Sequence, residues 1–420
     1  MKKKLVSLLA LGLFTAGVTG CNKGGNSSSN PSGNPGSNPS SNPSGNPSGN
    51  PSGNSLDIAM ISDVGTIDDG GFNQYTWEGV KKVGKDLNKS TGYIVPKEDG
   101  DDERKASIDG MLKRGAKAVV LTGYKFNDLV GEYAKKNPNV AWFLIDGSSS
   151  TVENLENVYS VEFKEQEAGY LAGYAVVKDG YKNLAFLGGM AVPAVERFGF
   201  GYLSGICDAA EELAKTTPAT QIQVKFGYTG DFNPSEANLT NSKTWYNSGV
   251  EAIFACGGAI CKSVEAAAKS VGANRAKIIG VDVNQHPQQP DLYITSAEKK
   301  VEKTTYDAIK LYFDSNKDLT GKWPTAQAGK HEILGAKQGK IGLPTEADSA
   351  GDPWTFKNFT KEQYNTLYQK LVGNDTYTKV ISDNDGTTKV SGALNNDHVQ
   401  ITFASVGQNV LNKPTLKNAA

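Results

Sequence analysis

The chain contains few of the residues that carry metal, redox or acid–base chemistry. Among its 420 residues there are four cysteines and three histidines. His286, His331 and His398 are scattered and far from any paired cysteine, so the sequence has no zinc-binding pattern. An excess of positive charge is also missing, since the formal net charge is -1, whereas nucleic-acid-binding surfaces carry a large excess of lysine and arginine. We therefore expect no metal, no cofactor and no nucleic-acid partner.

The apolar run at residues 5–18 is too short for a stable membrane span. It follows three lysines and is broken by small residues, which is typical of a secretory signal peptide. It ends in Val18-Thr19-Gly20-Cys21, which resembles a bacterial lipoprotein cleavage box; the alternative is an ordinary signal peptide followed by a chance cysteine. We predict a signal peptide over residues 1–20 and a lipidated, palmitate-bearing Cys21 at the extracytoplasmic face of the cell membrane.

Residues 22–54 consist almost entirely of asparagine, proline, serine and glycine. Such a composition has no apolar surface to offset the entropy of ordering, so we predict a disordered tether over residues 21–54. The cysteines beyond it, Cys207, Cys256 and Cys261, are odd in number, which excludes a complete disulfide framework. Cys256 and Cys261 could pair, but the apolar stretch around each favours packing as small buried hydrophobes.

From Leu56 onward, short apolar runs alternate with helical periodicity. The runs predict strands at 56–61, 118–121, 140–145, 184–187, 222–226, 252–255, 278–281 and 294–296. Helices are predicted at 72–88, 103–114, 126–136, 165–177, 194–214, 234–247, 260–271 and 301–314, and a capping box of Thr360 and Gln363 predicts one more through Val372. This alternation indicates an α/β fold with parallel sheets, and so many units fit two doubly wound lobes better than one sheet.

Ligands of open α/β sheets bind beyond the carboxyl ends of the strands, so the residues that follow each strand are the candidates for a site. After the first strand, Asp68 or Asp69 can cap the next helix. Asn73 and Trp77 lie four residues apart, off the apolar stripe of that helix. Trp77 could stack on a flat ring whose edge Asn73 reads, or it could simply cover the surface of a lobe while Asn73 is solvated.

Three later strand ends also carry candidate residues. Asp146 follows the strand at 140–145, Gly257 and Gly258 follow the strand at 252–255, and Asp282 follows the strand at 278–281. A carboxylate at these positions could accept two hydrogen bonds from vicinal hydroxyls, or it could hold a turn. Paired glycines permit close approach of a ligand to the backbone, and they also suit ordinary tight turns.

Several stretches together resemble the basic membrane protein family of lipoproteins, which are solute receptors of ABC transporters and include purine nucleoside receptors. The resemblance spans roughly residues 56–344. It is carried by Asp68-Asp69-Gly70-Gly71-Phe72-Asn73-Gln74 with Trp77-Glu78-Gly79, by residues 161–173, by Phe186-Leu187-Gly188-Gly189, by residues 198–201, by Gly280-Val281-Asp282 and by Thr295-Ser296 with Lys299. Two departures, Asn284 and Gly70-Gly71, leave the preferred base open.

The resemblance implies a type I periplasmic-binding-protein fold, with two doubly wound Rossmann-like lobes joined by a hinge. On this fold we place an N-terminal lobe at 55–160 with a return segment near 285–320, a C-terminal lobe at 161–284, and an extension at 321–420 that completes the lobes and is partly unassigned. It also implies a monomeric receptor that passes a nucleoside to a membrane permease. The implied contacts are Asn73 and Trp77 with the base, Asp146 with its edge, Asp282 and Lys299 with the ribose, Gly257 and Gly258 beside the ribose, and Asp68 as a recurrent acid.

Other functions stay open at this point. An enzyme is disfavoured, because hydrolysis needs a positioned acid–base group and an activated water, and the histidines lie outside the expected cleft, with the possible exception of His286. A receptor for a sugar, an amino acid or an autoinducer could use the same fold. An adhesin or surface antigen would also suit a lipid anchor and a tether, and it would bind no small molecule saturably.

Overall fold

The computed structural model describes residues 55–63, 65–148, 152, 154–315, 320–373, 397–404 and 406. The predicted signal peptide, Cys21 and the tether therefore lie outside the described residues. Where the chain is described, no helix combines the length and the apolar character that crossing a bilayer requires.

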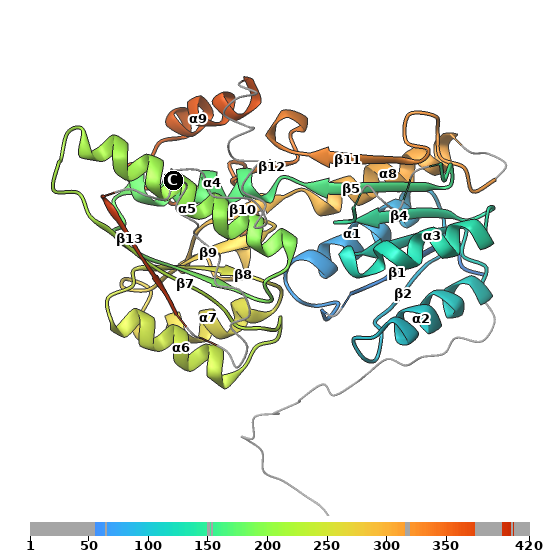
Figure 1. Cartoon of the computed structure of the whole chain (residues 1–420), viewed down its shortest axis with the longest axis horizontal. Helices are drawn as coiled ribbons and strands as arrows, with labels where there is room; N and C mark the ends of the chain where they lie inside the picture. The colour runs from blue at the N-terminus through green and yellow to red at the C-terminus, as the bar shows by residue number, and fades with distance from the viewer. Residues whose placement is uncertain are drawn as a thin grey trace, which may run out of the picture. The chain divides into compact units, whose positions relative to one another are not determined.

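Two sheets organise the described residues (Figure 1). The first contains six parallel strands: β1 Ile58–Ile61, β2 Thr91–Ile94, β3 Ala118–Thr122, β4 Ala141–Ile145, β5 Val158–Phe163 and β11 Lys330–Leu334. Their order is β11-β5-β4-β3-β1-β2. β1, β3 and β4 are buried along their whole length, as strands covered on both faces must be, which explains their continuous apolar runs.

The second sheet contains seven strands of the described chain: β6 Asn183–Gly188, β7 Ile222–Tyr228, β8 Ala252–Cys256, β9 Lys277–Asp282, β10 Tyr293–Lys299, β12 Ile341–Gly342 and β13 Val399–Phe403. Their order is β12-β10-β9-β8-β6-β7-β13, and all pairs are parallel except β10 with β12. β10 therefore belongs to this sheet, although it falls inside the return segment predicted at 285–320. The return to the first sheet begins at the next helix.

Helices cover both faces of each sheet. On the first sheet, α2 (Asp101–Lys113) and α3 (Asn127–Lys136) share one apolar cluster with the strands, while α1 (Phe72–Asp86) and α8 (Val301–Ser315) pack on the other face. On the second sheet, α6 (Glu236–Asn247) and α7 (Ile260–Val271) lie opposite α4 (Glu165–Asp179), α5 (Pro193–Ala214) and α9 (Lys361–Gly373). We call the first sheet with its helices the first lobe and the second sheet with its helices the second lobe. The predicted doubly wound architecture is confirmed.

Within the described residues, the chain passes between the lobes three times. It does so at Lys164, between β5 and α4, at Lys300, between β10 and α8, and over residues 335–340, between β11 and β12. Helix α9 packs on the third crossover, because the Tyr368 hydroxyl lies 3.0 Å from the Ala336 carbonyl oxygen and 3.1 Å from that of Ile341. The capping box that predicts α9 is present, since the Thr360 N–H donates to Gln363 Oε1 (2.9 Å) and the Gln363 N–H donates to Thr360 Oγ1 (3.2 Å).

Close packing of α4 on α5 explains two glycines in the family-like stretches. A Cβ at Gly169 would lie 2.1 Å from the carbonyl oxygen of Phe198, and a Cβ at Gly201 would lie 2.0 Å from that of Gln166. Both distances are far below van der Waals contact, so any larger residue would force the two helices apart. Glycine at these two positions therefore permits the close packing of α4 on α5.

Candidate functional site

A cavity lies between the carboxyl ends of the strands of both lobes. From the first lobe it is lined by side chains that follow β1, β3 and β4, including Asp63, Phe72, Asn73, Lys125 and Asp146. From the second lobe it is lined by the start of α5 and by the residues after β7, β8 and β9, including Val195, Arg197, Phe198, Phe232, Gly257, Gly258 and Asp282. Lys299, at the end of β10, also lines it. This is the edge at which open α/β sheets bind their ligands.

Asp146 and Asp282 occupy equivalent places in the two lobes, each at the carboxyl end of a central strand. Both have left-handed backbone conformations, with φ of 56° and 67°. This region is sparsely used by residues other than glycine and costs on the order of 1 kcal/mol, although aspartate tolerates it better than most residues. Such strain is concentrated at functional sites. In both residues the turn directs the carboxylate toward one cation, Lys299.

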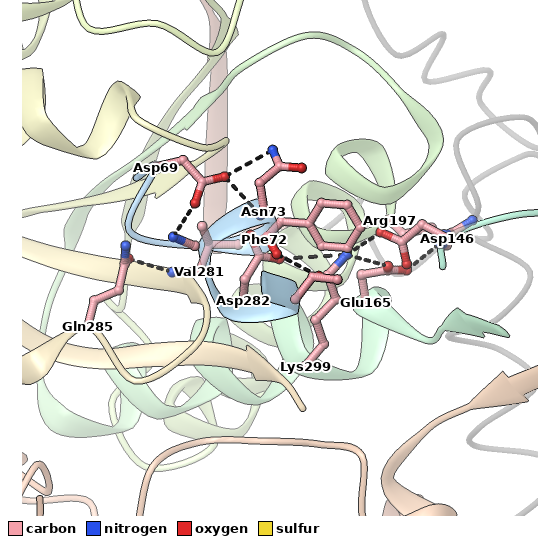
Figure 2. A network of polar contacts seen from close by, with 12 residues as sticks. Asp69, Phe72, Asn73, Asp146, Glu165, Arg197, Val281, Asp282, Gln285 and Lys299 are labelled. Atoms are coloured by element: carbon pink, nitrogen blue, oxygen red, sulfur yellow. Dashed lines mark hydrogen bonds and ion pairs between the residues drawn. The ribbon is translucent and has the colours of Figure 1, made fainter. Parts of the chain in front are cut away.

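Lys299 joins the two lobes through three carboxylates (Figure 2). Its Nζ lies 2.5 Å from Asp146 Oδ2 in the first lobe and 3.6 Å from Asp282 Oδ1 in the second lobe. The third partner is Glu165 at the start of α4, 3.2 Å away through Oε1. The ammonium also lies 4.6 Å from the centroid of the Phe72 ring. A single buried lysine at a crossover thus binds acids from both sides of the cavity.

A second cation continues this network. The Nε of Arg197 donates to Glu165 Oε2 (2.6 Å), and its Nη1 lies 3.0 Å from Glu162 Oε1. Glu162 belongs to β5 in the first lobe and Arg197 to α5 in the second lobe, so this ion pair also crosses between the lobes. Sequence reasoning did not identify Glu162, Glu165 or Arg197 as site residues.

Burial dominates the electrostatics of the cavity. It raises the pKa of Asp282 to about 7, and the nearby Lys299 ammonium only partly opposes this shift. It also raises the pKa of Glu162 to about 7, with Arg197 as the main opposing group. Burial alone would lower the pKa of Lys299, but the carboxylates of Asp146, Glu165 and Asp282 outweigh it and raise this pKa instead. Lys299 is therefore charged at neutral pH, while Asp282 and Glu162 titrate there.

The raised pKa of Asp282 predicts that the free energy of unfolding depends on pH. Its pKa rises from 3.8 to about 7 on folding, so between these values the unfolded chain loses a proton that the folded protein keeps. The contribution of Asp282 to stability is therefore present below pH ~4 and is lost as the pH rises to ~7, by as much as about 4 kcal/mol. We expect urea unfolding to show wild type losing stability relative to Asp282→Asn between pH 5 and pH 7.5. A difference that stays constant with pH would contradict this.

Asp69 caps α1. Its carboxylate accepts hydrogen bonds from the backbone N–H groups of Gly71 (2.8 Å), Asn73 (3.0 Å) and Gln74 (3.1 Å). Of the two aspartates predicted as possible caps, Asp69 therefore fills the role, whereas Asp68 is exposed and its side chain is not among those that line the cavity.

Asn73 lines the cavity, but its amide also binds protein groups. Nδ2 donates to Asp63 Oδ1 (3.1 Å) and Asp69 Oδ2 (3.2 Å), and Oδ1 accepts from Thr122 Oγ1 (3.1 Å). Asn73 thereby fixes the carboxylate of Asp63, a partly buried residue that sequence reasoning did not select. The turn after β1 and the start of α1 form one hydrogen-bonded wall.

The structure does not place Trp77 in the cavity. Its ring packs on Tyr93, with centroids 5.0 Å apart, and is partly buried against the apolar core. Trp77 shares a helix face with Asn73, but α1 points its amino end at the cavity, and four residues along a helix amount to about 6 Å of rise. Trp77 therefore lies one helical turn farther from the cavity than Asn73. This corrects the expectation that Trp77 stacks on the base of the ligand. Phe72, at the first position of α1, is the ring of this helix that lines the cavity.

Gly257 and Gly258 line the cavity where β8 meets α7, with φ of 154° and 49°. A Cβ at Gly257 would lie 2.8 Å from the backbone nitrogen of Gly189, and a Cβ at Gly258 would lie 3.3 Å from Phe232 Cβ. Glycine is therefore required at both positions because neighbouring loops of the protein lie too close to leave room for a side chain. Cys256, just before them, is buried and is not joined to Cys261 by a disulfide.

Hydrogen bonds also link the lobes beside the cavity. The carbonyl oxygen of Gly70 in the first lobe accepts from Gln285 Nε2 (3.1 Å) and Gln288 Nε2 (3.2 Å) in the second lobe. The carbonyl oxygen of Asp68 accepts from Lys262 Nζ (2.9 Å) on α7. These bonds hold the loop between β1 and α1 against the second lobe.

Two doubly wound lobes with a cavity at the carboxyl ends of their strands define the periplasmic-binding-protein fold. A solute-binding protein of an ABC transporter system from Aeropyrum pernix K1 has the same fold, with a TM-score of 0.64 and 22% identity over 80% of this chain and 99% of that one. A second such protein, from Conexibacter woesei, has a TM-score of 0.55 and 18% identity over 76% and 97% of the two chains.

The chain belongs to the PnrA-like family of ABC transporter substrate-binding proteins, whose model matches residues 57–385. It is 29% identical over 238 residues to the ABC transporter nucleoside-binding protein BmpA of Lactococcus lactis, which covers 55% of this chain and 64% of that protein. It is 28% identical over 287 residues to basic membrane protein D of Borreliella burgdorferi, which covers 68% and 78%. The match thus spans just under two thirds of the Lactococcus relative.

Proposed function

We propose that the protein captures a nucleoside, with a purine base preferred, between its lobes and delivers it to an ABC permease. The observation that carries this proposal is the convergence of Asp146, Asp282 and Lys299 from both lobes on one cavity that also has aromatic walls. Vicinal hydroxyls of a ribose suit an ionised carboxylate paired with an ammonium. Phe72 and Phe232 offer apolar faces from opposite lobes for a flat base. A relative named for nucleoside binding adds support.

In this proposal the protein binds its ligand without converting it. The three histidines all lie in the described part of the chain, and none of them lines the cavity. Because both lobes contribute contacts, the ligand binds the closed arrangement of the lobes more tightly than the open one. Binding therefore stabilises the closed arrangement. We further propose that the mature chain is a monomer, held at the outer face of the membrane by lipid on Cys21 and by the tether of residues 21–54.

Titration calorimetry with adenosine, guanosine, inosine, cytidine and uridine tests the proposal directly. We expect micromolar or tighter binding of at least one purine nucleoside. Free ribose and galactose serve as comparison ligands, because a carboxylate–lysine cluster also suits a sugar. Saturable binding of a sugar without binding of any nucleoside would favour the sugar receptor, and no saturable binding at all would favour an adhesin.

The aromatic wall gives a sharper prediction. We expect Phe232→Ala to weaken nucleoside binding by about 1–3 kcal/mol, the range found when a ring that stacks on a base is removed. Trp77→Ala is the matched control, since Trp77 packs on Tyr93 and does not line the cavity. It is expected to change the affinity by less than about 0.5 kcal/mol. If the two variants behave in the opposite way, the stacking surface has been assigned to the wrong ring.

A further inference from the structure

The three hydrogen bonds that hold the loop between β1 and α1 against the second lobe lie outside the cavity. The carbonyl oxygen of Gly70 accepts two of them, from Gln285 and Gln288, and that of Asp68 accepts the third, from Lys262. None of these five residues lines the cavity, and none belongs to the three crossovers between the lobes. A movement that parts the lobes about the crossovers must therefore break these bonds.

The side chain of Gln285 is already fixed within the second lobe. It is fully buried, and its Oε1 accepts a hydrogen bond from the Val281 N–H (3.0 Å). The N–H of Gln285 itself donates to Ser296 Oγ (3.0 Å). Ordering a free glutamine side chain on contact would cost conformational entropy, and here that cost falls on the folding of the second lobe. Gln285 therefore presents Nε2 to the first lobe as a preformed donor.

Gly70 is equally fixed as the acceptor in the first lobe. Its backbone is left-handed, with φ of 74°, a conformation that suits glycine. Its N–H donates to Gln74 Oε1 (3.0 Å) at the start of α1. A Cβ at this position would lie 3.3 Å from both Nε2 and Oε1 of Gln288. Glycine thus leaves the space in which the amide of Gln288 reaches the carbonyl oxygen.

The turn that carries Gln285 and Gln288 is held from its outer side by Asp348. Asn284 Nδ2 donates to Asp348 Oδ2 (2.7 Å), and His286 Nδ1 lies 2.9 Å from the same oxygen. Asn284 and His286 flank Gln285 in the chain. A single carboxylate thereby fixes the turn on both sides of one donor and two residues before the other.

Asp348 is itself held in a tight turn of the C-terminal extension. Its Oδ1 accepts from the Ala350 N–H (2.7 Å), and its own N–H donates to the carbonyl oxygen of Gly351 (2.7 Å). An acid in place of Asn284 would set two carboxylates against each other, which is unfavourable. Asn284 and Gly70, both singled out in the sequence as departures from the family pattern, thus belong to one arrangement.

We propose that Lys262, Gln285 and Gln288 form a latch that holds the lobes closed from outside the cavity, with Asp348 as the residue that positions it. The latch adds the same stabilisation to the closed arrangement with any solute and before a solute arrives. It therefore sets how often the empty cavity opens and how long a solute stays. This inference goes beyond the proposed function, because it does not depend on which solute the cavity takes.

Cys256 provides a readout of opening without an added probe. It lines the cavity and is 1% exposed, whereas Cys207 is buried within the second lobe and does not line the cavity. We expect methyl methanethiosulfonate to reach Cys256 when the lobes part, and to reach Cys207 only when the second lobe unfolds. Mass spectrometry of peptides from the ligand-free full chain gives both labelling rates. Dissociation of radiolabelled adenosine gives the time for which a ligand stays.

The latch is weakened by a double variant, Lys262→Met with Gln288→Leu. We expect the label to reach Cys256 about 3–10-fold faster than in wild type and adenosine to dissociate about 3–10-fold faster, since two of the three hydrogen bonds are lost. The labelling rate of Cys207 is expected to stay unchanged, because both substituted side chains lie outside the core of the second lobe.

Lys269→Met with Gln289→Leu is the matched control. Lys269 lies on the same helix as Lys262, and Gln289 directly follows Gln288. In the described chain, no hydrogen bond or ion pair joins either side chain to the first lobe. We expect both rates to stay within about 1.5-fold of wild type, as for most surface substitutions.

Asp348→Ala tests the positioning role. We expect about 2–5-fold faster labelling of Cys256, because the turn that carries the donors loses its outer support. Asp352→Ala is the control in the same loop, since its carboxylate accepts from the Trp354 N–H (3.0 Å) and from Lys361 (3.2 Å) and not from the turn. A merely structural role of Asp348 would raise the labelling of Cys207 together with that of Cys256.

The outcomes separate this inference from the proposed function. Equal labelling of Cys256 in the two double variants would overturn the latch, whichever ligand binds. Equal labelling in the Asp348 and Asp352 variants would overturn the positioning role. Failure of every nucleoside to bind would overturn the proposed function and leave the test of the latch standing, because thiol labelling of the ligand-free chain uses no ligand.

Discussion

Exchanging Lys299 for methionine is expected to lower the free energy of unfolding by about 3–5 kcal/mol, the cost of removing one partner from a buried ionic cluster. Its Nζ contacts the carboxylates of Asp146, Glu165 and Asp282, and its side chain is 3% exposed. Without the ammonium, these acids stay buried with too little positive charge nearby. Urea unfolding at pH 7.5 measures the loss.

Lys303→Met is the matched control. Lys303 is 69% exposed and pairs with Asp307 on the surface of α8, and such pairs contribute about 0–1 kcal/mol. The loss for Lys299→Met should shrink at pH 5, where the carboxylates with raised pKa values take up protons and no longer need a cation. If the two lysine variants lose equal stability, Lys299 does not hold the lobes together electrostatically.

Asp282→Asn is expected to weaken nucleoside binding by about 2–4 kcal/mol, while the affinity for the corresponding free base changes by less than about 0.5 kcal/mol. The reason is that hydrogen bonds to a charged acceptor contribute about 1.5–3 kcal/mol each, and in the proposed pose Asp282 accepts them from ribose hydroxyls. Calorimetry with inosine and hypoxanthine measures both affinities at a pH above 7, where most of the Asp282 carboxyl is ionised. Asp68→Asn is the control, because its carboxylate is exposed and its contact with Lys262 uses the main-chain carbonyl. Equal losses for nucleoside and base would remove Asp282 from the ribose.

Eight strands could be predicted because a strand that is buried on both faces of its sheet is usually a continuous run of apolar residues, which is visible in the sequence. All eight predicted strands are present, and the boundaries differ by a few residues. Five described strands were missed, namely β2, β5, β11, β12 and β13. β5 is buried, but Ser160 and Glu162 interrupt its apolar residues, and β12 has only two residues. β2 is only partly buried, and β11 and β13 lie at the edges of their sheets with exposed positions. Such strands lack the continuous apolar run on which the prediction depends.

The site could be predicted only in part. Asp146 and Asp282 stand directly at strand ends, so the topology of the fold places them at the cavity. Glu165 could not be found in this way, because it follows β5, a strand that was not predicted from the sequence. Trp77 was misplaced because helical periodicity gives the face of a residue and says nothing of its depth along the helix axis.

The bonds that close the lobes beside the cavity have main-chain acceptors on the first lobe, at Asp68 and Gly70. A carbonyl oxygen persists whichever side chain a mutation introduces at its residue. Changes in the loop between β1 and α1 can therefore reshape what the cavity accepts without erasing the contacts that shut it. We therefore expect ligand preference and the contact between the lobes to depend on different atoms of the same loop.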